Sequence, residues 1–315
     1  MDRDTVSHIA VDWGTSSFRL WALDAAGRVR GERRSAEGLA HSSTAGFEAV
    51  LESHIAALGL GSHVPVIACG MVGSRHGWQE AAYLDVPVPL DRLIAGAIPV
   101  RDARRPVRIL PGIARRERGE PDVMRGEETQ LLGLAANLDR SQDILACLPG
   151  THSKWVRIRA GAVNGFATFM TGELFQLLRT GSVIAPAVEA APPVDPDEPA
   201  FAAGVADALA APASMTNRLF GLRAGWLVEG TPPGATLARL SGLLIGTELA
   251  GARQRFGSLD GTALVVSGPA AALYTRALAI AGSIGIAVFD AETCVREGLH
   301  AAALTLFPQL DGATP

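Results

Sequence analysis

Two strand-turn-strand segments with hydroxyl-rich turns most constrain how this 315-residue chain can fold. The first reads IAVDWGTSSFRLWAL from Ile9, and the second reads LPGTHSKWV from Leu148. Each has an apolar lead-in, a Gly-Thr pair, a Ser, a basic residue and an apolar exit. Because the pattern occurs twice, it predicts two α/β domains of related topology, with Gly14 and Gly150 at equivalent points.

The order of the remaining segments agrees with two domains, and a prior of about 150 residues per domain points the same way. We expect Thr44 to cap the first helix, and the segment 185–204, rich in Ala, Pro and acid, to be an exposed loop or excursion and not a domain linker. We expect domains at residues 1–141 and 142–315, with a cleft between them for the site. The predicted strands are 8–13, 18–24, 28–40, 64–73, 108–113, 143–150 and 155–161, and the predicted helices are 45–60, 123–138 and 236–257. Strand is predicted to pass into helix within 163–181, 262–282 and 284–304.

Composition indicates a soluble globular protein and excludes several classes of function. Hydrophobic residues make up 48% and charged residues 19%, and no apolar run is long enough to span a bilayer. The charged N-terminus has no signal-peptide pattern, so we expect a cytoplasmic protein. The net charge of -4, without a basic block, gives no sign of nucleic-acid binding.

The three cysteines and seven histidines are dispersed along the chain. No pair of cysteines or histidines has the spacing of a metal or redox motif, so we expect buried reduced thiols and no protein-bound zinc.

The residue types in the two turns favour binding of phosphate. A glycine at the end of a strand lets backbone N–H groups approach an anion, and the Thr and Ser hydroxyls add donors. Asp12, just before the first turn, fits beside phosphate if Mg²⁺ lies between them, held through water. Arg19 and Lys154 supply the positive charge that phosphoryl transfer needs. An ordinary hairpin with a polar turn is the alternative for either copy alone.

Several blocks carry a family resemblance over nearly the whole chain. IAVDWGTSSFRLW, LPGTHSKW and VVSGPAAAL resemble the two phosphate motifs and the adenosine motif of the actin, Hsp70 and sugar-kinase superfamily. GMVGSRHGW (70–78), VMRGEETQLLG (123–133), LPGTHSKWV (148–156), FMTGELFQLL (169–178) and LSGLLIGTELA (240–250) resemble the 2-dehydro-3-deoxygalactonokinase family, in that family's order. In the adenosine motif, Pro269 and alanines follow Gly268 where glycine or a hydroxyl is more common, which affects side-chain contacts to ribose.

This resemblance implies two ribonuclease-H-like, actin-like ATPase domains with a nucleotide cleft between them. It further implies phosphorylation, by ATP with Mg²⁺, of the 6-hydroxyl of 2-dehydro-3-deoxy-D-galactonate in galactonate catabolism. Gly268 would lie under the adenosine. The residues expected to bind phosphate or nucleotide are Gly14, Thr15, Ser16, Ser17, Arg19, Gly150, Thr151, His152, Lys154 and Gly268.

A general base must orient the attacking hydroxyl and accept its proton. The candidates are Glu127, Glu128 and Asp12, and similarity of this region to exopolyphosphatases favours Glu127. The alternative is that both glutamates only complement a helix N-terminus. Arginines in two blocks are candidates for binding the carboxylate of the acid. The expected substrate-binding residues are Met71, Ser74, Arg75, Arg125 and Glu128.

The sequence leaves other functions open. An exopolyphosphatase-like phosphohydrolase would use the same turns and Glu127 with water as the nucleophile. A kinase for another 2-keto-3-deoxy sugar acid, or an ATP-binding regulator of the actin type, are further alternatives. The sequence does not determine the oligomeric state; a symmetric dimer is the default expectation.

Overall fold

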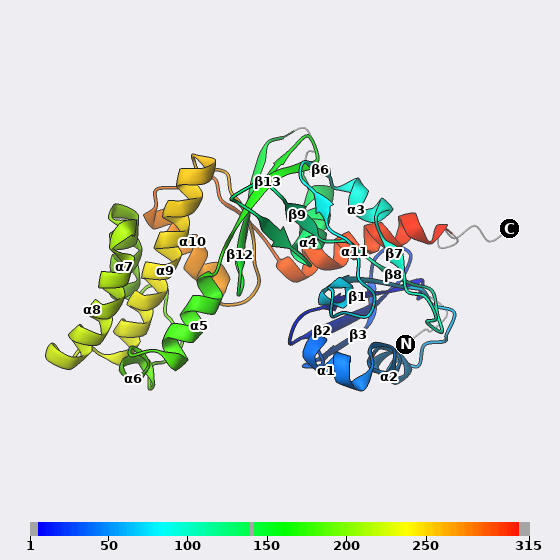
Figure 1. Ribbon diagram of the computed structural model, residues 1–315, viewed down its shortest axis with the longest axis horizontal. Helices are drawn as coiled ribbons and strands as arrows, with labels where there is room; N and C mark the ends of the chain where they lie inside the picture. Colours follow the sequence, from blue (N-terminus) through cyan, green and yellow to red (C-terminus); the bar gives the residue numbers. More distant parts are fainter. Residues whose placement is uncertain (1–5, 139–141, 309–315) are drawn as a thin grey trace. The chain divides into compact units, whose positions relative to one another are not determined.

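The computed structural model describes residues 6–138 and 142–308 and divides into two compact units (Figure 1). Unit 1 consists of Met1–Gln142, Ile158–Gly165 and Asp290–Pro315, and unit 2 of Asp143–Arg157 and Phe166–Phe289. The sequence had suggested a single boundary after residue 141, which lies outside the described residues. The units are instead discontinuous, because the C-terminal segment packs with the first half of the chain.

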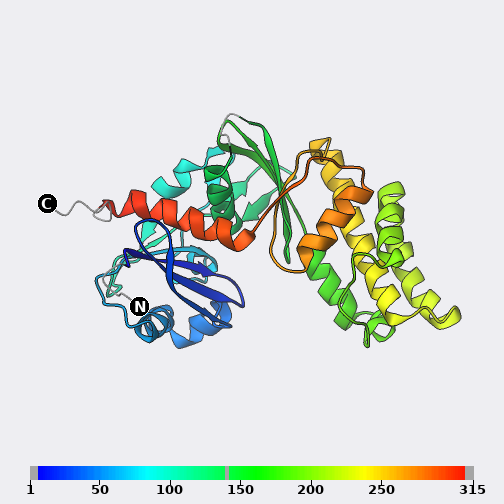
Figure 2. The same ribbon diagram turned by 180° about the vertical axis from the view of Figure 1, so that it is seen from behind.

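A six-stranded sheet in the order β3-β2-β1-β4-β8-β7 forms the centre of unit 1. Its central strand β1 pairs antiparallel with β2 and parallel with β4. Helices α1 and α2 lie on one face and α11 lies on the other, as both views show (Figures 1 and 2). Burial on both faces explains why β1 and β4 are almost continuously apolar. The bounds are β1 His8–Trp13, β2 Phe18–Leu23, β3 Val29–Ser35, α1 Leu39–Ala45, α2 Phe47–Ala57, β4 Val66–Gly70, β7 Ile98–Pro99, β8 Val107–Ile109 and α11 Ala291–Leu306.

The rest of unit 1 contains a small three-stranded sheet, in the order β10-β9-β5, and two helices. A short 3-10 turn, Met71–Gly73, follows β4 directly. Helix α4 packs along α11, so the segment that carries the candidate base is anchored on the C-terminal helix. The bounds are β5 Leu84–Asp85, β6 Val88–Pro89, α3 Asp91–Ala95, β9 Ile113–Arg115, β10 Asp122–Met124 and α4 Glu127–Ala136.

Unit 2 contains a sheet in the order β15-β14-β11-β12-β13, and β13 continues into unit 1, where it pairs with β6. Helices α7 and α9 pack along each other, and α5, α6, α8 and α10 also pack against α9. The strands are β11 Ile144–Leu148, β12 Ser153–Arg159, β13 Ala162–Phe169, β14 Ala263–Val265 and β15 Ala287–Phe289. The helices are α5 Thr171–Gly181, α6 Ala185–Val188, α7 Pro199–Ala210, α8 Met215–Val228, α9 Pro233–Phe256 and α10 Ala270–Ile280.

The two units share a strand order, which confirms the prediction of related topology. The order β3-β2-β1-β4-β8 of unit 1 corresponds to β13-β12-β11-β14-β15 of unit 2. In both, the central strand is followed by one of the two glycine-hydroxyl turns, so Gly14 and Gly150 occupy equivalent points. None of the described helices is long and apolar enough to cross a membrane.

Three local predictions were wrong. Thr44 lies inside α1 and caps no helix; Gly46 precedes α2 instead. The predicted strand 108–113 is divided between β8 and β9 of different sheets, because Pro111 and Gly112 interrupt it. The predicted loop 185–204 contains α6 and the start of α7, with Phe201 fully buried.

Candidate active site

The first turn, residues 14–17, connects β1 to β2 in unit 1. The Gly14 N–H donates to the Ser17 carbonyl oxygen at 2.8 Å and closes the turn. Thr15 and Ser16 at its tip are exposed. The tip of the turn is therefore accessible, and its binding of phosphate stays a prediction.

Acidic side chains gather beside this turn. Asp12 is 21% exposed, and its Oδ2 lies 3.7 Å from Nη1 of Arg19. The Cys69 thiol of β4 donates to Oδ1 of Asp12 at 3.9 Å. Burial raises the pKa of Asp12, the charge of Arg19 opposes this, and the charge of Glu127 adds to it. Asp12 is paired with Cys69 of β4 in the sheet. A Cβ at Gly126 would lie 3.6 Å from Cα of Gly70, the next residue of β4, so the start of α4 with its two glutamates lies close to the strand that neighbours Asp12.

The two glutamates that begin α4 have different environments. Glu128 is fully buried and accepts the Gly126 N–H at 2.7 Å and the Thr129 hydroxyl at 3.1 Å. Burial, and then the charge of Glu127, raises the pKa of Glu128 to about 8. Glu127 is partly exposed and accepts the Arg125 N–H at 3.1 Å. Of the two, Glu127 has the access to solvent that a reacting group needs.

Arg125 lies behind the 3-10 turn that follows β4. Its Nη2 donates to the Ala81 carbonyl oxygen at 2.7 Å, and its guanidinium carbon lies 4.3 Å from the centre of the Tyr83 ring. Its Nε and Nη1 are buried and have no hydrogen-bond partner among the described residues, and the same holds for Oγ of Ser74. A Cβ at Gly73 would lie 2.9 Å from Nη1 of Arg125, so this turn and the guanidinium are close neighbours.

The other two residues predicted to bind substrate lie nearby in the chain but differ in exposure. Met71 begins the 3-10 turn and is partly buried. The side chain of Arg75 is 83% exposed, with its Nε 4.0 Å from Oε1 of Glu80. Arg75 therefore faces solvent, whereas the guanidinium of Arg125 is held in place by its neighbours.

The second turn follows β11 in unit 2. A Cβ at Gly150 would meet no atom within 4 Å, so the backbone there is open. The exposed His152 pairs through Nε2 with Oε2 of Glu173 at 2.5 Å. Lys154 is 4% exposed, and its Nζ donates to the His152 carbonyl oxygen at 3.1 Å. Lys154 thus supports the turn from behind, and His152 has a carboxylate partner.

A pocket of about 520 Å³ in unit 2 brings the second turn and the adenosine motif together. Gly268 has a φ of +70° and leads into α10, and the next two residues line the pocket. The volume is in the range typical of sites for small ligands. A second pocket, about 620 Å³ along α8, contains none of the predicted site residues. The pocket of about 520 Å³ is lined among others by Pro149, Gly150, Thr151, Thr171, Gly172, Arg179, Pro269, Ala270 and Tyr274.

The sequence interpretation missed a buried polar network below this pocket. Glu248 of α9 is 1% exposed and accepts the Trp155 indole N–H at 2.9 Å, the Tyr274 hydroxyl at 2.7 Å and the Thr171 hydroxyl. The Ser153 hydroxyl bonds to that of Tyr274 at 2.9 Å. The one available signal was an acid inside the apolar helix segment LSGLLIGTELA.

No group of three or more His, Cys, Asp and Glu with the arrangement of a metal site occurs among the residues that the structure describes. The donor set still fits one Mg²⁺ held mainly by water and phosphate, because Asp12 offers a carboxylate among like charges. The three cysteines are buried and free, as predicted.

Comparisons with known proteins find relatives over nearly the whole chain. A family model described as 2-keto-3-deoxy-galactonokinase matches residues 12–302. The chain is 48% identical to a probable 2-dehydro-3-deoxygalactonokinase, DgoK1, of Rhizobium meliloti (strain 1021), over 96% of this chain and 98% of that protein. It is 34% identical to 2-dehydro-3-deoxygalactonokinase of Escherichia coli (strain K12), over 95% of this chain and 98% of that protein.

Solved structures agree on the fold. The crystal structure of a Sinorhizobium meliloti protein assigned as a 2-dehydro-3-deoxygalactonokinase superposes with a TM-score of 0.92 at 48% identity, covering 96% of this chain and 99% of the other. Component A of the Acidaminococcus fermentans (R)-2-hydroxyglutaryl-CoA dehydratase has a TM-score of 0.52 at 13% identity, covering 96% of this chain and 98% of the other. The latter supports an actin-like ATPase fold alone.

Proposed function

The chain belongs to the 2-keto-3-deoxy-galactonokinase family, a family of carbohydrate kinases, and we propose that it transfers the terminal phosphoryl group of ATP to the 6-hydroxyl of 2-dehydro-3-deoxy-D-galactonate. The product is 2-dehydro-3-deoxy-6-phosphogalactonate, which fits a place in D-galactonate catabolism in the cytoplasm. The observation that carries the proposal is that Asp12, and the start of α4 with the accessible Glu127, lie at the ends of neighbouring strands beside the exposed hydroxyl-rich turn. Metal, base and phosphate donors are the parts that phosphoryl transfer to an alcohol needs.

Glu127 is our candidate for the general base. It is the glutamate of α4 with solvent access, since it is partly exposed whereas Glu128 is fully buried. Glu128 holds the Gly126 N–H from a buried position, so we assign it to positioning α4 and not to contact with the sugar acid.

Asp12 is our candidate for holding Mg²⁺ through water. When bound with ATP, the ion neutralises charge on the phosphate oxygens during transfer. Asp12 supplies an oriented carboxylate, and Arg19 beside it limits the repulsion among the acids. Thr15 and Ser16 provide hydroxyl and N–H donors for the phosphates at the open tip of the turn.

Arg125 and Ser74 are our candidates for the carboxylate of the sugar acid. A buried donor without a partner costs about 1–3 kcal/mol, and a carboxylate would satisfy two such donors of one guanidinium. Such groups are Nε and Nη1 of Arg125 and Oγ of Ser74, which are buried and have no hydrogen-bond partner among the described residues. Because Arg75 is exposed, Arg75→Ala serves as the matched control for Arg125→Ala, which should raise the KM for the acid.

The pocket of unit 2 is our candidate site for the nucleotide. The open backbone at Gly150 suits phosphate, and the positive φ of Gly268 lets the chain turn closely under a flat base. Pro269 and Ala270 supply apolar contact. Lys154 and His152 then help to fix the shape of the second turn. Lys154 does so through its bond to the His152 carbonyl oxygen, and His152 through its pair with Glu173.

A coupled ADP-release assay over a panel of 2-keto-3-deoxy sugar acids tests the proposal. We expect release that depends on the galactonate-derived acid, and a fall in kcat of about 10²–10⁴-fold for Glu127→Gln. Glu117→Gln, at a 66% exposed side chain of the same unit, is the control and should retain activity.

The outcomes separate the alternatives. No acceptor-dependent release with any acid would reject the kinase proposal. Steady phosphate release from ATP or polyphosphate without acid would favour the phosphohydrolase. Full activity of Glu127→Gln would reject the base assignment alone.

A further inference from the structure

The segment 37–39, which follows β3, contacts the first turn from behind. The Leu39 N–H donates to the Gly14 carbonyl oxygen at 3.0 Å. A Cβ at Gly38 would lie 2.5 Å from the Thr15 carbonyl oxygen and 2.6 Å from the Ser16 nitrogen. Only a residue without a side chain fits against the turn at this distance, so the position of this segment limits where the turn can lie.

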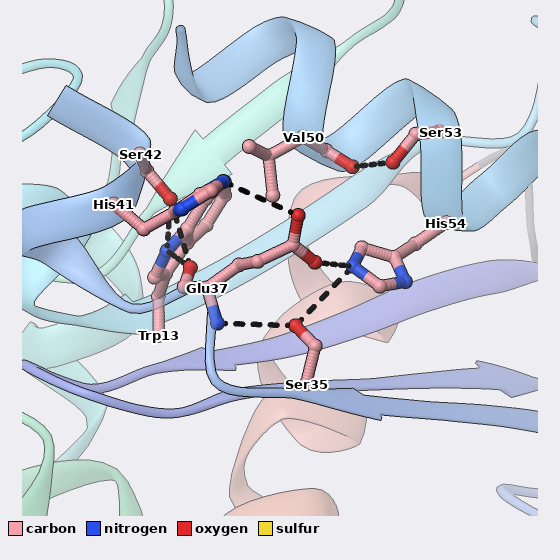
Figure 3. Close-up of polar contacts among 8 residues, drawn as sticks. All are labelled: Trp13, Ser35, Glu37, His41, Ser42, Val50, Ser53 and His54. Carbon is pink, nitrogen blue, oxygen red and sulfur yellow. Dashed lines mark hydrogen bonds and ion pairs between the residues drawn. The ribbon is translucent and has the colours of Figure 1, made fainter. Parts of the chain in front are cut away.

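The residue before this contact, Glu37, is fixed at both its backbone and its side chain (Figure 3). Its carbonyl oxygen accepts the Trp13 indole N–H at 3.2 Å and the Ser42 hydroxyl at 2.8 Å. Its carboxylate lies 2.7 Å from Nε2 of His54 and 3.4 Å from Nε2 of His41. Figure 3 shows the carboxylate between the two imidazoles, with Trp13 on the other side of the Glu37 backbone.

The same network reaches both ends of the turn. Trp13 is the residue directly before Gly14, and Phe18 is the residue directly after Ser17. The ring of His54, which is 5% exposed, stacks on that of Phe18 with 4.6 Å between centroids and 21° between planes. Glu37 therefore links the entry and the exit of the turn through Trp13 and His54.

We propose that Glu37, held by His54, is a positioning residue that fixes the backbone of residues 14–17 for binding of the ATP phosphates. The inference rests on the proposed function, which assigns this turn to phosphate. Hydrogen-bond donors that already point toward the phosphoryl group need not reorient during the reaction. Small displacements of such donors lower reaction rates strongly. Glu37 reaches the nucleotide only through the turn, so its loss should alter ATP kinetics more than binding of the sugar acid.

The test compares Glu37→Gln and Gly38→Ala with a matched control on the same helix as His54. Glu52 of α2 pairs with the buried Arg105, with Oε1 at 2.6 Å from Nε, and this pair has no contact with residues 14–17 among the contacts of the described chain. Glu52→Gln therefore perturbs unit 1 without touching the turn. For each variant, kcat, the KM for ATP, the KM for the acid and the melting temperature are measured.

We expect kcat/KM for ATP to fall about tenfold or more in Glu37→Gln and Gly38→Ala, with the KM for the acid changed by less than about twofold. Glu52→Gln should lower the melting temperature and leave kcat/KM for ATP near the wild-type value. Melting temperature lowered in all three variants, with unchanged ATP kinetics, would overturn the inference.

Ser16→Ala separates this inference from the proposed function. If Ser16→Ala impairs use of ATP and Glu37→Gln does not, Glu37 has no positioning role and the phosphate assignment stands. If neither variant affects use of ATP, the assignment of the turn to phosphate fails, and the inference fails with it.

Discussion

The two glycine-hydroxyl turns occupy equivalent points of two related sheets, but different structures support them. The first turn, 14–17, is closed by its own hydrogen bond and backed by the segment 37–39, in which Gly38 is buried. The second turn, 150–152, is backed by the start of α5: the Glu173 N–H donates to the Thr151 carbonyl oxygen at 2.9 Å. The same local sequence pattern can thus be held by unrelated tertiary contacts.

Each turn also has a fully buried tryptophan next to it, and the partners of the two indoles differ. The indole of Trp13 donates to a backbone carbonyl oxygen and a hydroxyl, Glu37 O and Ser42 Oγ. The indole of Trp155 donates to the carboxylate of Glu248, which is almost fully enclosed. Removal of the Glu248 carboxylate should therefore lower stability more than removal of the Ser42 hydroxyl, because Glu248 is the acceptor for three buried donors at once.

Glu248→Ala should give the largest loss of stability. It leaves the Trp155 indole and the Tyr274 and Thr171 hydroxyls without their acceptor, and we expect the free energy of unfolding to fall by about 3–5 kcal/mol. Hydrogen exchange measured by segment should show the loss in β11 and β12 while β1 and β2 keep their protection.

Two variants control this experiment. Glu248→Gln keeps an acceptor oxygen and should lose less stability than Glu248→Ala. Glu229→Ala, at the exposed end of α8, should change stability by less than about 0.5 kcal/mol. Equal effects of Glu248→Ala and Glu229→Ala would show that the buried network does not support the second turn.

Acid pH should weaken the strand of the first turn and not that of the second. β1 begins at the buried His8, whose Nε2 lies 3.2 Å from Nδ1 of His300, whereas β11 begins with an apolar run. Burial and then the charge of His300 lower the pKa of His8 from 6.5 to about 4, with Asp24 opposing. Between pH 6.5 and pH 4 the unfolded chain binds a proton at His8 that the folded chain does not, so stability falls with acidification.

We expect this loss to be on the order of 2 kcal/mol, measured by denaturant unfolding at a series of pH values. His8→Gln should remove that part of the pH dependence, and His63→Gln, at an exposed side chain, should keep it. An unchanged pH dependence in His8→Gln would mean that His8 does not link protonation to the stability of β1.

Local sequence patterns were enough to predict the turns, most of the strands and the helix that begins at Glu127. Glycine, hydroxyl and alternating apolar residues act within a few positions, so a single sequence displays them. Glu248 could not be predicted as a network centre, because its partners Trp155 and Thr171 lie 93 and 77 residues away. The helix around Phe201 was missed because prolines precede it and Pro199 occupies its first position, where proline is compatible with a helix but resembles a loop signal in the sequence.

For the predicted site residues too, the sequence indicated the residue types but not their burial. The spacing of VMRGEETQLLG gave both glutamates, but burial, which depends on the packing of α4 against α11, decides that Glu128 is enclosed and Glu127 is accessible. The sequence did not distinguish Arg75 from Arg125 as candidates for binding the carboxylate. The structure does, because the side chain of Arg75 is exposed and Nε and Nη1 of Arg125 are buried. Glu37 gave no local signal, since its contacts with His54 and Trp13 form only when β3 lies beside β2.

Gly172→Ala, a change in the support of the second turn, has the smallest expected effect and tests the comparison most directly. A Cβ at Gly172 would lie 2.4 Å from the Gly150 carbonyl oxygen and 2.8 Å from the Thr151 Cα, so the turn must shift. We expect kcat/KM for ATP to fall about tenfold, because the shift would displace the groups of the second turn that are proposed to bind phosphate. Gly181→Ala, at the end of the same helix and with no atom within 4 Å of its Cβ, should retain wild-type kinetics. A Gly172→Ala enzyme with wild-type ATP kinetics would mean that the second turn tolerates displacement, and that the phosphates depend mainly on the first.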